Sequence, residues 1–401
     1  MDISESSGYK DFIWAIELNR WSLELIGLWP NTDGIVKRKL GPDIRAGFIF
    51  IMILFISGIP LVCALTRVWG NMALMIDNLR ITLPILTVLL KLVIMRWKQS
   101  VLLCIIDMIA EDWLALKLSV ERNVMLKYAR RARLIMICGF IILISLFILV
   151  VILPYFGLPF RHLTNLTDRS KPLPLQSYYF YDTDKSPQFE LTFFAQAVTI
   201  FLVIIIYIAV NAFVGCVILH ICGQLENFKG RLNNLISCKN FNRILSNSIV
   251  IHLRLIRFAN NTENAFTLML FVLIFQFGIG FCLCGFILLS VMTDENLNVA
   301  NFTLISYMIV AVVSLFMQTF LYCFGGDLIT EQCDAVYRTI CDLEWYTLES
   351  RKARNLILLM LLAKEPFRIT AGKILPLTMT TFCSLLRTSA GYISLLLAKR
   401  N

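Results

Sequence analysis

The chain has 401 residues, of which 58% are hydrophobic and 16% are charged, and its mean hydropathy is +0.73. This composition excludes a large soluble enzyme and indicates a polytopic membrane protein. The net charge of +10 does not indicate a nucleic-acid partner, because the basic residues are scattered between apolar blocks. We interpret these residues as determinants of orientation in a lipid bilayer.

Apolar runs long enough to cross a bilayer occur seven times. A helix needs about 20 apolar residues to span a hydrocarbon core of about 30 Å. The runs lie near residues 46–66, 77–95, 134–156, 191–219, 265–292, 302–325 and 374–398. Arg80, Lys91 and Arg96 make the second run short. The sequence therefore predicts an all-α polytopic membrane protein with seven transmembrane helices.

The distribution of Lys and Arg predicts how these helices are oriented. Residues 1–45 lack the apolar core of a signal peptide, so we expect a cytosolic amino terminus. The segments on the cytosolic side then carry 27 Lys and Arg, and the segments on the opposite side carry 8. This asymmetry follows the positive-inside rule and predicts an extracellular carboxyl terminus.

Four regions follow from this topology. We expect a cytosolic segment over residues 1–45 and a six-span ligand-binding bundle over 46–325. Cytosolic anchor helices are expected over 326–373, and a last span over 374–401. Within the bundle, the Pro- and Tyr-rich outer loop 157–190 is interpreted as a lid over a cavity or as a plain connector.

The inner segments are expected to be helical. Residues 220–264 and 327–348 contain amphipathic patterns, which suit either a helix on the bilayer surface or a helical base shared between subunits. Gly325 and Gly326 are expected to break the sixth helix where it leaves the membrane. Pro366 is expected to end the last inner helix.

Two asparagines are candidate glycosylation sites. Asn165 and Asn301 each begin an N-x-Thr sequon in a predicted outer loop, whereas the sequon at Asn260 falls on the inner side. None of the 12 cysteines lies in the outer loop 157–190, so a disulfide framework is not expected.

The sequence offers no motif for catalysis or metal binding. His162, His220 and His252 are not at ligand spacing, and no cysteine pair has a partner pair at zinc spacing. Phosphate-binding loops and hydrolase nucleophile motifs do not occur. We therefore expect no enzyme activity, metal or cofactor.

The last span differs from an ordinary lipid-facing helix. On a projection at about 100° per residue, one narrow stripe contains small or polar residues and ends on a bulky apolar residue. The stripe comprises Thr381, Ser384, Thr388, Gly391 and Leu395. It indicates a wall that faces water and is closed by a leucine. Arg387 lies about 80° from Leu395 around the helix, so we interpret it as a lateral contact.

A second set of residues suits an apolar pocket. It lies in the outer halves of the second, third, fourth and sixth spans and contains few polar groups. Such a set can line a cavity for a small, weakly polar ligand, although ordinary helix packing gives the same pattern. The set comprises Ile81, Pro84, Phe147, Ile148, Phe193, Phe194, Ala197, Phe302, Ser306, Tyr307 and Val310.

The carboxyl-terminal fifth of the chain resembles the insect odorant receptor family. The resemblance lies in GGDLITEQCDAVYRTICDLEWYTL (325–348) and in RKARNLILLMLLAKEPFRITAGKILPLTMTTFCSLLRTSAGYISLLL (351–397). It implies a ligand-gated, non-selective cation channel of four subunits in the plasma membrane of sensory neurons. It also implies that odorant binds in the outer half of each bundle and that the last span of each subunit lines the pore.

The same resemblance suggests roles for three residues of the last span. The narrow hydrophobic gate of the family falls on Leu395, three residues after Tyr392. Gly391 replaces the Ser or Thr that precedes this tyrosine in the family. The chain is too short to hold the long insertion of the common co-receptor, so we expect a ligand-selective subunit that forms a heterotetramer with that co-receptor.

Other membrane proteins remain as alternatives. A G-protein-coupled receptor also has seven spans, but it needs an extracellular amino terminus, against the 27 to 8 charge distribution. A gustatory-type channel would be expected to carry a terminal T-Y-x5-Q-F signature, which is absent. A transporter would usually be expected to show inverted repeats and helices broken at mid-membrane, and we find neither in the sequence.

Overall fold

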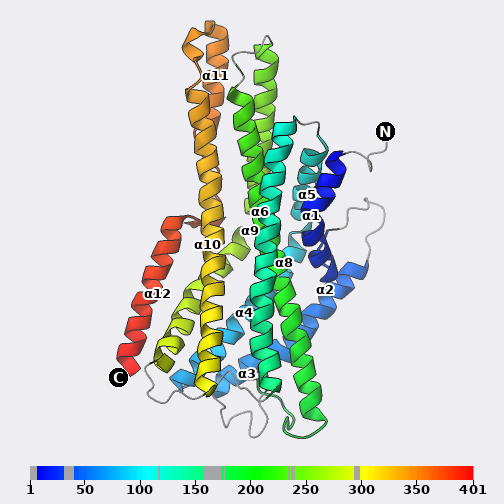
Figure 1. Ribbon diagram of the computed structural model, residues 1–401, viewed down its shortest axis with the longest axis vertical. Helices are drawn as coiled ribbons and strands as arrows, with labels where there is room; N and C mark the ends of the chain where they lie inside the picture. The colour runs from blue at the N-terminus through cyan, green and yellow to red at the C-terminus, as the bar shows by residue number, and fades with distance from the viewer. Residues whose placement is uncertain are drawn as a thin grey trace.

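The computed structural model describes residues 7–30, 40–115, 118–156, 173–175, 177–233, 235, 240–292 and 299–400, and these residues are almost entirely helical (Figure 1). The elements are α1 (Ser7–Leu25), α2 (Leu40–Ile53), η2 (Leu54–Gly58), α3 (Ile59–Arg67), α4 (Met72–Trp97), α5 (Gln99–Leu114), α6 (Ser119–Phe147), η3 (Ile148–Ile152), α7 (Leu153–Tyr155), α8 (Gln188–Asn233), α9 (Phe241–Met292), α10 (Val299–Cys341), η4 (Trp345–Thr347), α11 (Ser350–Ala363), β1 (Thr370–Ala371), β2 (Leu375–Pro376) and α12 (Met379–Arg400).

Seven helical segments of the described chain are long and apolar enough to cross a membrane, which confirms the predicted number. They are Leu40–Arg67, Leu74–Trp97, Ser119–Tyr155, Gln188–Asn233, Phe241–Met292, Leu304–Thr347 and Met379–Ala398. The second predicted span forms an uninterrupted helix, α4, although Arg80 and Lys91 lie within it.

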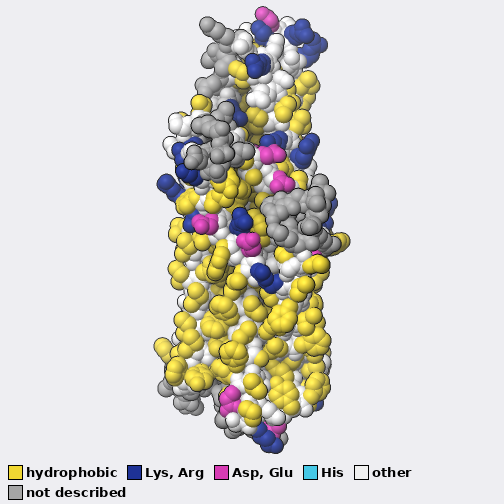
Figure 2. All heavy atoms as spheres, turned by 90° about the vertical axis from the view of Figure 1, so that its right-hand side faces the viewer, with side chains coloured by type: hydrophobic (Ala, Val, Ile, Leu, Met, Phe, Trp, Pro, Cys, Tyr) yellow, Lys and Arg dark blue, Asp and Glu magenta, His cyan; other side chains and the backbone are white. Residues whose placement is uncertain are grey.

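The surface of the molecule divides into an apolar part and a charged part. On the face shown in Figure 2, hydrophobic side chains cover the lower half, whereas Lys, Arg, Asp and Glu gather over the upper half and at the lower tip. Phe48, Phe55, Ile141 and Phe201 are among the exposed apolar side chains of the spans. A continuous apolar surface is what a helix bundle presents to lipid.

The helices differ in how deeply they are packed. In the most apolar window of α8, 72% of the residues are buried inside the protein, against 11% in α12. Because α8 is apolar on all sides, it can pack among α6, α9 and α10 at the centre of the bundle. By contrast, α12 packs mainly against α9 and α10 and lies at the side of the bundle (Figure 1).

Three helices continue well beyond a membrane-spanning length. α8 extends to Asn233, α9 begins at Phe241 and α10 extends to Cys341. The amphipathic inner segments are therefore continuations of the spans rather than separate helices. The predicted break at Gly325 and Gly326 is wrong, because α10 passes through both residues. At Gly326, a Cβ would lie 2.1 Å from the Leu377 carbonyl oxygen, so the glycine permits close packing instead.

The last span begins later than predicted, at Met379 instead of Ile374. Residues 370–376 form a short antiparallel hairpin in which Ala371 pairs with Leu375. Its turn contains Gly372 and Lys373 with φ of 67° and 60°. Apolar composition alone does not distinguish this hairpin from the first turn of a helix. α11 ends at Ala363, before Pro366, as predicted.

Candidate functional site

A cavity lies inside the bundle between α4, α6, α8, α9 and α10. Its volume is about 190 Å³ and its walls are mostly apolar. The lining residues are Arg80, Leu83 and Pro84 of α4, Leu143 and Leu146 of α6, Val203, Ile204 and Tyr207 of α8, Gln276, Gly280 and Cys284 of α9, and Tyr307, Ala311, Ser314, Leu315 and Gln318 of α10. Largely apolar walls with a few polar groups are typical of sites for small molecules.

Only part of the predicted pocket set lines this cavity. Pro84 and Tyr307 do so. Ile81, Phe147, Phe193 and Ala197 are partly buried against the main core instead.

The remaining pocket residues lie nearer the surface. Ile148, Phe194 and Phe302 have 41%, 69% and 70% of their surface exposed. Ser306 donates a hydrogen bond to the Phe302 carbonyl within its own helix, and Val310 is partly exposed. The structure therefore places the cavity deeper in the bundle than the predicted set.

An ion pair lies at the wall of the cavity. Asp77 Oδ1 accepts hydrogen bonds from Arg80 Nε at 2.8 Å and from Arg80 Nη2 at 2.5 Å. The Arg80 guanidinium also lies over the Tyr307 ring, 4.9 Å from its centroid. The Arg80 side chain is 1% exposed. A buried cation is held by an opposite charge and an aromatic face, as burial in an apolar bundle requires.

A polar network joins three helices beside the cavity. Lys91 Nζ donates to Asn211 Oδ1 at 2.6 Å and lies 3.7 Å from the centroid of the Tyr207 ring. Asn211 Nδ2 donates to Gln318 Oε1 at 3.3 Å, and Gln318 Nε2 donates to Ser314 Oγ at 3.0 Å. Residues of α4, α8 and α10 are thereby connected across the bundle.

The described part of the predicted lid, residues 173–175 and 177–190, packs on η2, α3 and α8. Tyr179 donates to the Ile56 carbonyl at 2.7 Å and accepts from Gln196 Nε2 at 3.0 Å. Burial raises the pKa of Tyr179, which stays protonated and able to donate at neutral pH. Residues 178–181 border an open hollow of about 690 Å³ against η2, α3 and α8. The rest of the lid, residues 157–172 and 176, lies outside the described residues, and so does Asn165.

The second predicted glycosylation site lies at the start of a helix. Asn301 belongs to the first turn of α10. The orientation of its side chain lies outside what the structure describes.

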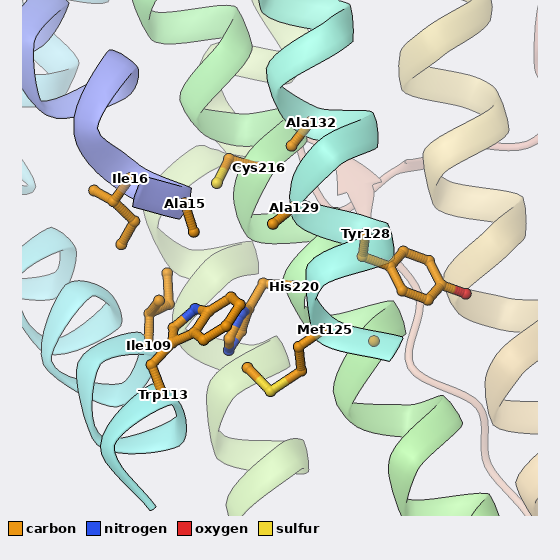
Figure 3. Close-up of a pocket in the computed structure, with 11 residues that line it drawn as sticks. Ala15, Ile16, Ile109, Trp113, Met125, Tyr128, Ala129, Ala132, Cys216 and His220 are labelled. Carbon is orange, nitrogen blue, oxygen red and sulfur yellow. The ribbon is translucent and has the colours of Figure 1, made fainter. Parts of the chain in front are cut away.

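A small void lies at the junction of α1, α5, α6 and α8 (Figure 3). Trp113, Met125 and His220 are among the residues that point toward it. Its volume is about 20 Å³, enough for about one water molecule. His220 Nε2 lies 3.0 Å from Asp112 Oδ2, and Arg254 donates to the same carboxylate at 2.8 Å. We therefore interpret this region as a structural junction.

The stripe on the last helix borders an open groove. Thr381, Ser384, Thr388 and Leu395, together with Tyr392, line a hollow of about 710 Å³ between α12 and α9. Leu395 and Tyr392 are 65% and 57% exposed. Gly391 lies on α12, where an added Cβ would meet open space.

Arg387 is exposed and lies outside the lining of this groove. This position agrees with its interpretation as a lateral residue.

The first turn of α12 is fixed to α10. Asp327 Oδ2 accepts a hydrogen bond from the Met379 backbone amide at 2.8 Å. A carboxylate is well placed at a helix N-terminus, because the backbone amides there lack partners within the helix. Thr381 Oγ1 donates to the Pro376 carbonyl at 2.7 Å. These bonds attach the base of α12 to α10 and to the preceding hairpin.

Several polar cavity residues were not selected from the sequence. Arg80, Gln276 and Gln318 lie in apolar runs, and a polar residue within a membrane span is itself a signal for a functional position. Applying that signal to every span, and not to Arg387 alone, would have found all three.

Sequence comparison with known proteins matches the chain to odorant receptors. The family described as "7tm Odorant receptor" matches residues 71–390. Odorant receptor 13a of Drosophila melanogaster is 24% identical over 249 residues, which cover 57% of this chain and 58% of that protein. Odorant receptor 10 of Aedes albopictus is 26% identical over 222 residues, covering 54% of this chain and 57% of that protein. The chain thus aligns with somewhat over half the length of these relatives.

The fold also matches a solved structure. The insect olfactory receptor OR5 from Machilis hrabei, solved in complex with eugenol, superposes with a TM-score of 0.81 at 16% sequence identity. The match covers 97% of this chain and 99% of that chain. At this identity the similarity establishes the fold.

Proposed function

Because the chain belongs to the 7tm odorant receptor family, we propose that it is the ligand-binding subunit of an odorant-gated, non-selective cation channel. Its ligands are small, mostly apolar volatile molecules that bind in the cavity between α4, α6, α8, α9 and α10. The observation that supports this proposal most is the position of α9, which separates the cavity from the groove along α12.

One segment of α9 contributes to both places. Gln276, Gly280 and Cys284 line the cavity, whereas Gly278 and Cys282, on the other side of the same helix, line the groove beside α12. A ligand that binds more tightly to one position of this segment shifts the population toward that position. Because the segment is a continuous helix, its displacement also changes the surface against which α12 packs. Ligand binding is thereby coupled to the last helix.

In the proposed channel, four subunits surround a pore lined by their α12 helices. Thr381, Ser384 and Thr388 form its wetted wall, Leu395 forms the gate, and Gly391 and Tyr392 lie beside the gate. The exposure of Leu395 and Tyr392 in the single chain supports this assignment, because neighbouring subunits would cover both residues.

The proposed assembly is a heterotetramer with the common co-receptor in the plasma membrane of sensory neurons. The charge distribution favours a cytosolic amino terminus and an extracellular carboxyl terminus.

Substituting the gate residue tests the pore. Leu395→Ala is expected to raise the ligand-free current severalfold in cells that express the chain with the co-receptor, because an apolar constriction excludes water and ions. Whole-cell recording without odorant measures this current. Leu358→Ala on α11, where the leucine is 59% exposed, is the matched control and should leave the current unchanged. An unchanged current in Leu395→Ala would remove this residue from the gate.

Substituting a cavity residue tests the ligand site. Tyr307→Ala is expected to change the order of potency among odorants while the ligand-free current stays the same, because the ring forms part of the cavity wall. Dose–response curves for a panel of odorants measure the order. Tyr346→Ala, at an exposed residue of η4, serves as control. An equal loss of response to every odorant would indicate impaired folding rather than altered recognition.

A further inference from the structure

Two buried polar side chains in the wall of the cavity each have one atom without a hydrogen-bond partner among the described residues. Arg80 and Gln276 are 6% and 5% exposed, and both line the cavity. Among the described residues, Arg80 Nη1 and Gln276 Oε1 have no hydrogen-bond partner. Leaving a buried donor or acceptor unpaired is costly, and the cost is larger when the group is charged. Two such groups in one cavity indicate a polar ligand that pairs with them.

The rest of each side chain is already held in place. Asp77 binds Nε and Nη2 of Arg80, so Nη1 is the remaining nitrogen of that guanidinium. The Gln276 side chain lies beside the Tyr207 hydroxyl, and its carbonyl oxygen has no hydrogen-bond partner among the described residues. The cavity therefore offers one charge-assisted donor and one acceptor on fixed supports, as selective recognition requires.

The charge at this site decides between neutral and anionic ligands. Arg80 is already paired with Asp77, and among the lining residues there is no further cation. An added carboxylate would bring a second negative charge to one guanidinium inside an apolar bundle, where unbalanced charge is expensive. The site therefore favours a neutral oxygen acceptor over an acid.

The volume limits the size of the ligand. A cavity of about 150 Å³ can hold benzene, and this one measures about 190 Å³. It suits a molecule slightly larger than benzene, on the order of nine heavy atoms.

We infer that the cavity selects neutral oxygenated compounds, in which a carbonyl or hydroxyl oxygen accepts from Arg80 Nη1, and that Gln276 Oε1 further favours compounds with a hydroxyl donor. This inference rests on the proposed role of the cavity as the ligand site. A carbonyl compound pairs with Arg80 alone, whereas an alcohol or phenol pairs with both groups.

Three compounds with one carbon skeleton test the inference: ethylbenzene, acetophenone and 1-phenylethanol. The purified receptor, in complex with its co-receptor, is heated with each compound to measure thermal stabilisation, and the same complex in cells is used for dose–response curves. For the natural chain, both oxygenated compounds should bind at least about tenfold more tightly than ethylbenzene, as about 1.4 kcal/mol from one hydrogen bond predicts. Equal binding of all three would overturn the inference.

Two variants separate the two groups. Asp77→Asn combined with Arg80→Met removes the donor without leaving an unpaired carboxylate. It should abolish the advantage of acetophenone and reduce that of 1-phenylethanol, which still pairs with Gln276, while ethylbenzene binds as before. Gln276→Leu should weaken 1-phenylethanol and spare acetophenone. The matched control combines Asp43→Asn with Arg96→Met, which removes an Asp–Arg pair between α2 and α4 outside the cavity lining and should leave the order intact.

The outcomes also separate this inference from the proposed channel. Equal loss of all three compounds in the Arg80 variant, or an unchanged order, would contradict the role of Arg80. Stabilisation in the expected order without any evoked current would contradict the channel proposal and leave the ligand class supported.

Discussion

Replacing Asn211 by leucine is expected to reduce the free energy of unfolding by about 3 kcal/mol. Asn211 Oδ1 is the hydrogen-bond acceptor for Lys91 Nζ, and Lys91 is 1% exposed. Among the described residues no carboxylate forms an ion pair with this lysine, so the variant leaves its amine buried with only the Tyr207 ring beside it. Removing one partner of a buried polar pair costs more than the pair itself contributes.

The companion variant follows from the same argument. Lys91→Met together with Asn211→Leu removes both partners, so the double variant should recover most of the lost stability. The fraction of receptor that remains monodisperse after heating measures the stability of each variant. Asn247→Leu, at an exposed position of α9, is the matched control and should change little. A double variant as unstable as Asn211→Leu alone would show that Lys91 is not the reason for the loss.

Replacing Gly326 by alanine is expected to have the second large effect, a loss of about 1–3 kcal/mol in stability together with altered gating. An added Cβ would lie 2.1 Å from the Leu377 carbonyl oxygen and 3.0 Å from the Leu377 carbonyl carbon. Because these are backbone atoms, the segment that leads into α12 must move. Asp327 holds the first turn of α12 through the Met379 amide, so this displacement changes the position of α12.

The control for this variant is a glycine with space around it. Gly215, on α8, has no atom within 4 Å of an added Cβ. Gly215→Ala should therefore be neutral or stabilise the helix by up to about 1 kcal/mol. Thermal stability and ligand-free current are measured for both variants. If Gly326→Ala matched the natural chain in both properties, the close contact with Leu377 would not constrain α12.

The sequence predicted the class of fold because that information is local. Each span needs only a long apolar run, and seven runs gave seven helices even where Arg80 and Lys91 interrupt the second. The boundaries were less predictable. Gly325 and Gly326 suggested a break, but tertiary packing against Leu377 decides their role. Residues 374–377 are apolar like a span, yet they belong to a hairpin and its flank.

The cavity was predicted less well than the fold, for a physical reason. Helical periodicity indicates which residues share a face, but the depth at which five helices leave a void depends on how their side chains pack. Pro84 and Tyr307 were found because they lie on inward faces of α4 and α10. Phe194 and Phe302 have the same apolar character but are exposed on the outer surface of the bundle, where lipid is the apolar partner.

The central claim is that ligand binding in this chain opens a cation pore directly. The most direct test is the odorant-evoked current in excised membrane patches from cells that express the chain with its co-receptor, recorded without nucleotides and with G-protein signalling blocked. We predict that the current persists under these conditions and that its ligand-free level rises in Leu395→Ala. Loss of the current when G-protein signalling is blocked would contradict the account.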